Sequence, residues 1–235
     1  MDWLAPERYA AELEAEAGRL GRAATGLNPD AVVPTCPDWT VRDLITHVGS
    51  GHRFAAEIIE TAGPVEYGRV PAPFDQDAWT AWLLDGARRL TAAVAARGFG
   101  AEVWSWHPEH QTAGFWLRRM VHDQVVHRFD ADPDGILAPD LAADGIADVL
   151  LSFEMFEALR GAGETLQFRA TDIPRSWHVT LTATGISWTD GDHPADATVA
   201  APAQQLLLIL NRRRPAPAVS GDPALWERWR ESSRF

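Results

Sequence analysis

Apolar and polar residues alternate with a helical period from residue 6 to about residue 160. In the segment Pro6–Leu27, apolar residues recur every three or four positions. They form one stripe, which consists of Tyr9, Leu13, Ala17, Leu20, Ala24 and Leu27. Pro6 suits a first helical turn, and the Gly and Pro residues between 26 and 29 should end the element. This pattern predicts an amphipathic helix that buries the stripe.

Three further segments show the same period. The helix predicted over 40–61 begins with Thr40, and Asp43 three positions later resembles the second half of a capping box. The patterns of 75–97 and 112–131 predict two more helices. Their expected inward residues are Trp79, Trp82, Leu83, Leu90 and Val94 in the first, and Phe115, Trp116 and Val126 in the second. Four helices of similar length, joined by loops rich in Pro and Gly, favour an antiparallel four-helix bundle.

The pattern changes after residue 165. Short runs rich in Thr, Val and Trp occupy 165–172, 176–183, 185–191 and 195–201, and turn residues lie between them. This pattern is typical of strands. Two helices should follow, in "AQQLLLILNRRR" and "DPALWERWRES". The predicted fold class is therefore α+β with two domains. A four-helix bundle should span 1–160, and a small α+β domain 165–235, with the boundary near 160–164.

Composition limits the possible partners and the compartment. The net charge of −12 should repel phosphate backbones and anionic lipid surfaces, which argues against nucleic-acid and membrane binding. The longest apolar run, "QLLLIL", is too short to span a bilayer. Cys36 is the single cysteine, so no intramolecular disulfide can form, and a reducing compartment is favoured. Because the first residues lack the pattern of a signal peptide, we expect a cytoplasmic protein.

The stretch "VHDQVVHRFDAD" at 121–132 holds two histidines and three aspartates. Asp123 and His127 are four positions apart, so their side chains share one face of the predicted helix. If the helix that carries His47 is a neighbour, the three side chains can meet inside the bundle. Two imidazoles and a carboxylate leave a fourth position open, as catalytic zinc requires. Asp130 follows on nearly the same face and could orient a ligand or transfer a proton.

Spacing alone leaves other interpretations open. The pair Asp123 and His127 also fits a solvated helix face, and a histidine such as His47 on an apolar helix is often a hydrogen-bonded core residue. His107 and His110 are expected in a loop. Cys36, next to a proline, fits a structural role better than that of a nucleophile.

Two segments carry a resemblance to a known family. "TCPDWTVRDLITH" at 35–47 and "RRMVHDQVVHRFDAD" at 118–132 resemble the signature segments of the mycothiol-dependent maleylpyruvate isomerase family, a branch of the DinB-like metal-binding bundles. The C-terminal segments "LLLILNRRR" and "VSGDPALWERW" resemble that family's sterol-carrier-protein-like second domain. The resemblance covers nearly the whole chain, with its segments in the same order.

The resemblance implies a zinc or other divalent metal site whose ligands are His47, Asp123 and His127. The family usually has Glu at the acidic position, and Asp123 is one methylene shorter. Asp130 matches the acid that closes the family's second segment. Arg213, with Arg212 as the alternative, matches an arginine that helps to bind the substrate carboxylate.

The resemblance also implies a low-molecular-weight thiol of the mycothiol type as cosubstrate. Coordination would deprotonate the thiol, and the thiolate would attack an electrophilic carbon of a small molecule such as maleylpyruvate. Candidates for holding the thiol are Arg42, Asp43 and Arg118. An S-transferase, a cis–trans isomerase, a zinc-hydroxide hydrolase and a non-catalytic binding protein all remain possible at this stage, and we expect a monomer or weak dimer.

Overall fold

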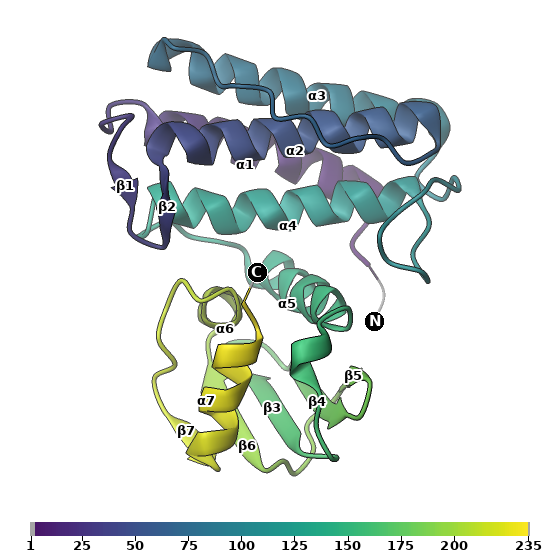
Figure 1. The fold of residues 1–235 in the computed structure, drawn as a ribbon, viewed down its shortest axis with the longest axis vertical. Coiled ribbons are helices and arrows are strands. Elements are labelled where there is room, and N and C mark those ends of the chain that lie inside the picture. The colour runs from purple at the N-terminus through teal and green to yellow at the C-terminus, as the bar shows by residue number, and fades with distance from the viewer. Residues whose placement is uncertain (1–2, 235) are drawn as a thin grey trace. The chain divides into compact units, whose positions relative to one another are not determined.

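The computed structural model describes residues 3–234 (Figure 1). These residues form two compact units, each described by itself. The first comprises Leu4–Gly135, and most of the second follows from Ile136 onward. The helices and the sheet confirm the predicted α+β fold class with a helical unit and a mixed unit.

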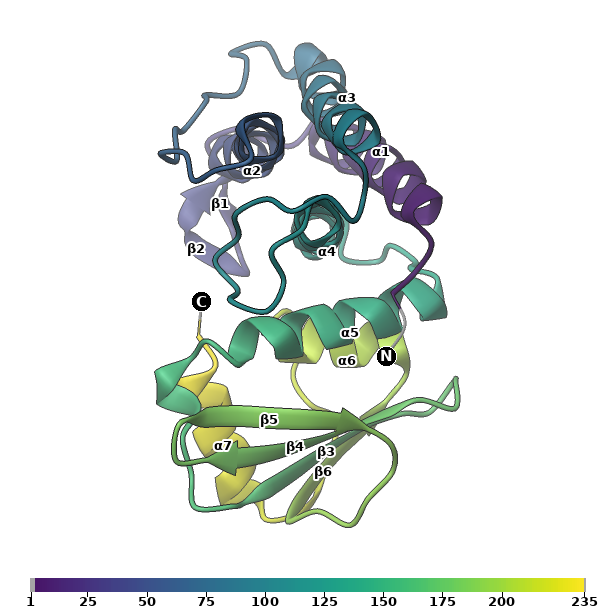
Figure 2. The same ribbon diagram turned by 90° about the vertical axis from the view of Figure 1, so that its right-hand side faces the viewer.

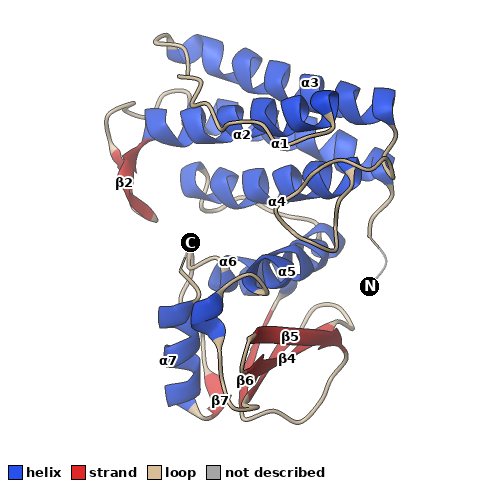
Figure 3. Ribbon diagram, turned by 45° about the vertical axis from the view of Figure 1, so that its right-hand side comes forward, coloured by secondary structure: helices blue, strands red, loops and turns tan. Residues whose placement is uncertain are grey.

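The first unit is a four-helix bundle. Its helices are α1 (Pro6–Ala24), α2 (Val41–Thr61), α3 (Trp79–Arg97) and α4 (Ala113–Ala131). Helices α1 and α2 each pack against both α3 and α4, as Figure 2 shows with α2 and α4 seen nearly end-on. Between α1 and α2, the strands β1 (Val32–Val33) and β2 (Cys36–Thr40) pair antiparallel, and β2 runs directly into α2 (Figure 3). A short 3₁₀ helix, η1 (Gln76–Ala78), precedes α3.

The apolar stripes explain most of this packing. The stripe of α1 is fully buried from Tyr9 to Ala24, but Leu27 is 39% exposed. The prediction for Leu27 was wrong because the helix ends at Ala24 and the chain then turns away. Trp82 faces the bundle as predicted, but it is only half-buried. Its ring packs on Gly49 of α2 and against the Arg53 guanidinium.

The start of α2 matters most for the site because His47 follows two turns later. Thr40 caps the helix, since its hydroxyl accepts a hydrogen bond from the Asp43 backbone NH. The Asp43 carboxylate in turn accepts from the Thr40 NH at 3.0 Å, which completes the predicted capping box. The capping box sets where α2 begins, and the start of the helix in turn sets the position of His47 along it.

The second unit contains a five-stranded sheet and three helices. Its elements are α5 (Pro139–Phe153), η2 (Glu157–Leu159), β3 (Thr165–Ala170), β4 (Ser176–Thr182), β5 (Gly185–Asp190), β6 (Ala197–Ala201), α6 (Ala203–Leu210), β7 (Val219–Gly221) and α7 (Pro223–Ser232). The strand order is β5-β4-β3-β6-β7, and only the β3–β6 pair is parallel. The aromatic rings of Phe153, Phe168, Trp226 and Trp229 pack together in its core.

The compact units divide after Gly135, not at the 160–164 boundary that the sequence suggests. The difference arises from α5, which packs against α6 and β5 of the second unit. Where independently folding domains begin and end stays a prediction. Within the described residues, no helix combines the length and apolar character that a transmembrane segment needs.

Candidate metal site

Three potential metal ligands converge inside the helical unit. His47 comes from α2, whereas Asp123 and His127 come from α4 and lie one turn apart on one face. One ligand atom from each lies within 4.8 Å of the others. Nε2 of His47 is 3.5 Å from Oδ2 of Asp123. In a tetrahedral zinc site with bonds of about 2.0–2.1 Å, neighbouring ligand atoms are about 3.3 Å apart. The geometry therefore fits one divalent ion after small side-chain movements.

The site is partly open to solvent. The side chains of His47 and Asp123 are 36% and 25% exposed, whereas that of His127 is 9% exposed. A small ligand can therefore approach from the side of His47 and Asp123. This combination of a buried and two accessible ligands suits a site that must admit a second molecule.

Asp123 is held in its anionic form. Burial raises the pKa of its carboxyl group, but the nearby His127, His47 and Arg119 outweigh burial and lower the pKa below its usual value. Arg119, one turn earlier in α4, places Nη2 3.5 Å from Oδ1 of Asp123. Asp123 therefore offers a charged carboxylate at neutral pH.

Asp130 contacts His127 at Nδ1, the ring nitrogen on the side away from the proposed ligand atom. Its Oδ2 is 2.8 Å from Nδ1 of His127, and its side chain is fully buried. The Thr35 hydroxyl donates to Oδ1 at 2.6 Å, and the Cys36 thiol donates to Oδ2 at 3.7 Å. An ionised carboxylate can only accept hydrogen bonds, so Nδ1 of His127 is the donor. In the neutral imidazole this leaves the lone pair on Nε2, which is available as a ligand.

An indole ring lies beside both ligand histidines. The Trp39 ring centroid is 4.5 Å from that of His47 and 5.4 Å from that of His127, while the two imidazoles are 4.8 Å apart. Sequence reasoning did not identify Trp39, Thr35 or Cys36 as neighbours of the site. It also missed Arg119. All four residues fall within the two segments that carry the family resemblance, and that was the available signal.

The other residues singled out in the first unit have different surroundings. Arg42 donates to the backbone oxygen of Pro73 at 2.9 Å, and its guanidinium lies over the rings of Phe74 and Trp79. Arg118 is buried in α4, five residues before Asp123, a spacing that turns it toward another face of the helix. A role for Arg42 or Arg118 in thiol binding stays a prediction.

Arg213 belongs to the second unit, in the turn that follows α6. Its Nη1 donates to the backbone oxygen of Asn211 at 2.9 Å. The neighbouring Arg212 adopts a left-handed backbone conformation, with φ of 64°. A contact between either arginine and a substrate carboxylate stays a prediction.

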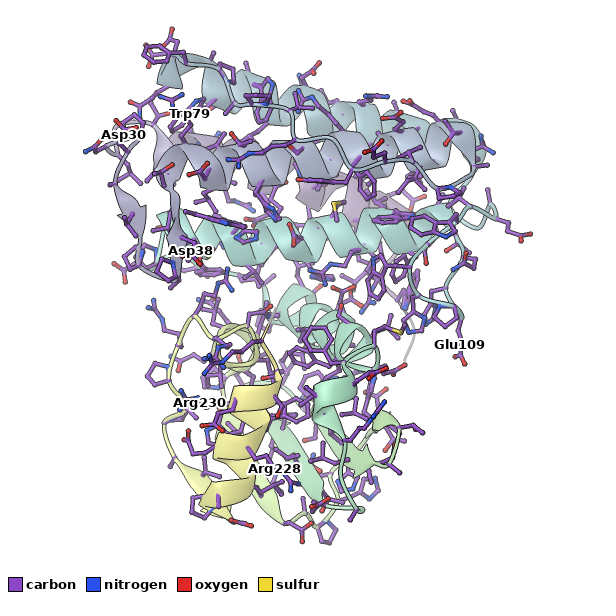
Figure 4. The ribbon with its side chains drawn as sticks, in the orientation of Figure 1. Asp30, Asp38, Trp79, Glu109, Arg228 and Arg230 are labelled. Atoms are coloured by element: carbon purple, nitrogen blue, oxygen red, sulfur yellow. The ribbon has the colours of Figure 1, made fainter. Side chains whose placement is uncertain are left out.

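The remaining histidines do not join the three ligands. His110 stacks on Phe115 at the start of α4, and the ring of His107 is tilted against both. Their loop, marked by Glu109 in Figure 4, lies at the opposite end of the helical unit from Asp38 of β2. His122 points toward Tyr9 of α1, as the five-residue spacing from His127 predicts.

Comparisons with known proteins place the chain in a family. The family model described as the mycothiol maleylpyruvate isomerase N-terminal domain matches residues 10–132, and that of the SCP-2 sterol transfer family matches residues 151–222. The crystal structure of a mycothiol-dependent maleylpyruvate isomerase is similar, with a TM-score of 0.64, 14% identity, and coverage of 92% of this chain and 93% of that one.

A point mutant of a mycothiol-dependent maleylpyruvate isomerase has a TM-score of 0.60 and 14% identity, over 87% of this chain and 88% of that one. At these identities the likeness shows a shared fold. A search of curated proteins finds no match.

Proposed function

The chain belongs to the mycothiol maleylpyruvate isomerase N-terminal domain family, and we propose on this premise that it is a metal-dependent enzyme using a mycothiol-type thiol. The thiol would act as a nucleophile on a small electrophile, in a cis–trans isomerisation or an S-transfer. The observation that carries the proposal is the convergence of His47, Asp123 and His127 at the end of the bundle where β2 meets α2.

In this proposal the two imidazoles and the Asp123 carboxylate hold zinc or another divalent ion. Such a donor set is typical of catalytic zinc, and three protein ligands leave one position for an exogenous group. A bound ion would lower the pKa of a coordinated thiol and so supply a thiolate near neutral pH. Arg119 holds the far oxygen of Asp123, which favours binding through Oδ2, the oxygen nearer to His47.

Asp130 is proposed to orient His127. A general base for the thiol would need access to the proton it removes, but the Asp130 side chain has no exposed surface. Its two oxygens already accept from His127, Thr35 and Cys36. An orienting carboxylate of this kind fixes the tautomer and the ring angle of a ligand histidine.

The substrate is proposed to be a small molecule with an electron-poor double bond, of the maleylpyruvate class. Addition of the thiolate sulfur to one carbon of the cis double bond would move the π electrons onto the conjugated carbonyl group as an enolate. The adduct then has a single bond about which it can rotate. Elimination then re-forms the double bond and returns the thiol. Arg213 is the proposed partner of a substrate carboxylate, since guanidinium groups match the geometry of carboxylates. A reducing cytoplasm, where small thiols stay reduced, is the proposed setting.

The test combines metal analysis with thiol titration. We expect purified protein supplied with zinc to hold one ion per chain and to bind mycothiol with release of a proton, since metal–thiolate formation releases one. Calorimetry in two buffers of different ionisation enthalpy measures that release. Protein with His47→Ala and His127→Ala is the matched control. Equal thiol affinity with and without metal, or binding without proton release, would overturn the proposal.

A further inference from the structure

The indole ring of Trp39 contacts the imidazole rings of both candidate ligand histidines, His47 and His127. From this juxtaposition we infer that Trp39 is a positioning residue, which sets the relative orientation of the His47 and His127 imidazoles. The inference rests on the proposed metal-dependent function. It assigns a role in that function to a residue that is not a proposed metal ligand and that touches the ligand histidines through ring contacts.

The segment that carries Trp39 is anchored at both ends. Near its start, the Thr35 hydroxyl donates to the Asp130 carboxylate at 2.6 Å. At its end, Thr40 and Asp43 form the capping box of α2. Between these anchors, β2 pairs with β1. The backbone of Trp39 is therefore tied to both helices that supply the ligands, α4 through Asp130 and α2 through the cap.

The two imidazoles come from different helices, so a side chain that contacts both can fix their orientation relative to each other. His127 is oriented from behind by Asp130, with Nδ1 2.8 Å from Oδ2. His47 meets Asp123 at the ligand side, with 3.5 Å between Nε2 and Oδ2. Its nearest ring contact is the indole of Trp39, at a centroid distance of 4.5 Å, and the His127 ring follows at 4.8 Å. Removal of the indole would leave space into which the His47 ring can rotate, so the ligand set would lose its preset geometry.

The indole also shields one side of the site. Trp39 is half-buried, and its apolar ring replaces water next to the imidazoles. An apolar shell around a metal site limits solvent access and strengthens the electrostatic interactions within it. The exposed parts of His47 and Asp123 then define the open side. Trp39 thus bounds the direction from which a thiol can approach.

A simpler alternative is that Trp39 only packs β2 against the bundle. The two roles differ in one measurable respect, because packing alone changes stability but not the coordination geometry of a bound ion. Cobalt(II) can replace zinc as a probe, since the intensity and position of its visible absorption report coordination geometry. The readout is therefore the cobalt spectrum and the cobalt affinity, not turnover.

The variants are Trp39→Leu, Trp39→Phe and the matched control Trp82→Phe. Trp82 is also half-buried and packs on Gly49 and Arg53 of α2. These residues follow His47 by two and six positions, a spacing that places them on another face of the helix. We expect Trp39→Leu to lower cobalt affinity about 10–100-fold and to change the visible band, as loss of outer-sphere support does. Trp39→Phe should fall between Trp39→Leu and the wild type, and Trp82→Phe should match the wild type.

The outcomes separate this inference from the proposed function. Wild-type affinity and spectrum in a folded Trp39→Leu protein would overturn the positioning role while leaving the metal site intact. If Trp39→Leu does not fold, the same result in Trp39→Phe would overturn it. Cobalt binding that survives His47→Ala with His127→Ala, or no cobalt binding by the wild type, would overturn the metal site and the inference together. An equal loss in Trp82→Phe would assign the effect to general packing.

Discussion

His127 and Asp130 lie one turn apart in α4, and Nδ1 of the imidazole is 2.8 Å from Oδ2 of the buried carboxylate. This pair joins the candidate metal site to the segment before α2, because Thr35 donates to the other carboxylate oxygen. A substitution of Asp130 should therefore change metal affinity, even though Asp130 is not among the proposed ligands.

We predict that Asp130→Asn lowers zinc affinity about 10–100-fold, the range typical of lost outer-sphere partners. The amide can present either an oxygen or an NH₂ group to His127, and it carries no charge to favour the Nδ1–H tautomer. Competition with a chromogenic chelator measures the affinity. Asp38→Asn, which changes an exposed carboxylate of β2, is the control. Unchanged zinc affinity with reduced turnover would instead identify Asp130 as a base.

The ligand set itself gives a second prediction. Zinc stoichiometry should fall from about one per chain to near zero when His47 and His127 are both replaced by Ala, because a single carboxylate cannot hold the ion. Asp123→Glu should bind zinc at least as well as the wild type, since Glu is the usual residue of the family at this position. Elemental analysis after dialysis measures both. Full zinc retention by the double variant would refute the ligand assignment.

The sequence predicts the bundle well because its helices carry their own signals. The buried stripe from Tyr9 to Ala24 and the capping box of Thr40 and Asp43 are local patterns, and the structure contains both. The sheet strands were likewise recognised from alternation, as in β4, where Trp177, Val179 and Leu181 are buried. Local patterns of this kind need no knowledge of the rest of the fold.

Other elements lacked such a signal. The sequence analysis does not separate α5 as an element of its own. Its polar residues recur every four positions, but Asp144, Asp148 and Ser152 are buried, so the helix has no exposed polar face that sets it apart from its surroundings. Strand β7 contains three residues, too few for alternation to be visible. The sequence therefore indicates a boundary near 160–164, after α5, whereas the compact units divide before this helix.

The site was predictable in part for the same reason. The spacing of Asp123 and His127 on one helix is local. The inclusion of His47 depends on its helix being a neighbour of theirs, which the family resemblance supports. The contact between Thr35 and Asp130 joins residues 95 positions apart, and the contacts of Trp39 depend on how two helices pack. Periodicity within one element cannot reveal contacts of this kind.

A third prediction concerns the buried ion pair between α1 and α4. Nε of Arg128 is 2.6 Å from Oε2 of Glu16, and both side chains are almost completely buried. Arg128→Met would leave the Glu16 carboxylate in the core without this partner, so we expect a loss of about 3–5 kcal/mol in the free energy of unfolding. Urea denaturation measures the loss.

The double variant Glu16→Leu with Arg128→Met is the control for this prediction. It should recover most of the lost stability, because apolar residues that replace both partners need no desolvation of charge. Burial already raises the pKa of Glu16 in spite of the nearby Arg128 and Arg19, which shows how costly the charge is at this position. A double variant as unstable as Arg128→Met would show that shape, not charge, dominates there.

A fourth prediction follows from His52, which is fully buried in α2. Burial lowers the pKa of its imidazole to about 4, although Asp123 and Gln124 partly oppose the shift. In the unfolded chain the pKa of a histidine is about 6.5. Between these two values the unfolded state binds more protons than the folded state, so the free energy of unfolding must fall as the pH falls from about 6.5 to about 4.

The full contribution of His52 to the free energy of unfolding should be about 3 kcal/mol. This value follows from a pKa difference of about 2.5 between the unfolded and folded states, with about 1.36 kcal/mol for each pKa unit. We therefore expect His52→Leu to lose less stability than the wild type between pH 7 and pH 4, whatever the cost of the substitution at neutral pH. Urea denaturation in the presence of a chelator, at intervals across this range, gives the difference between the two proteins. A difference that does not change with pH would mean that His52 takes up its proton within the folded protein.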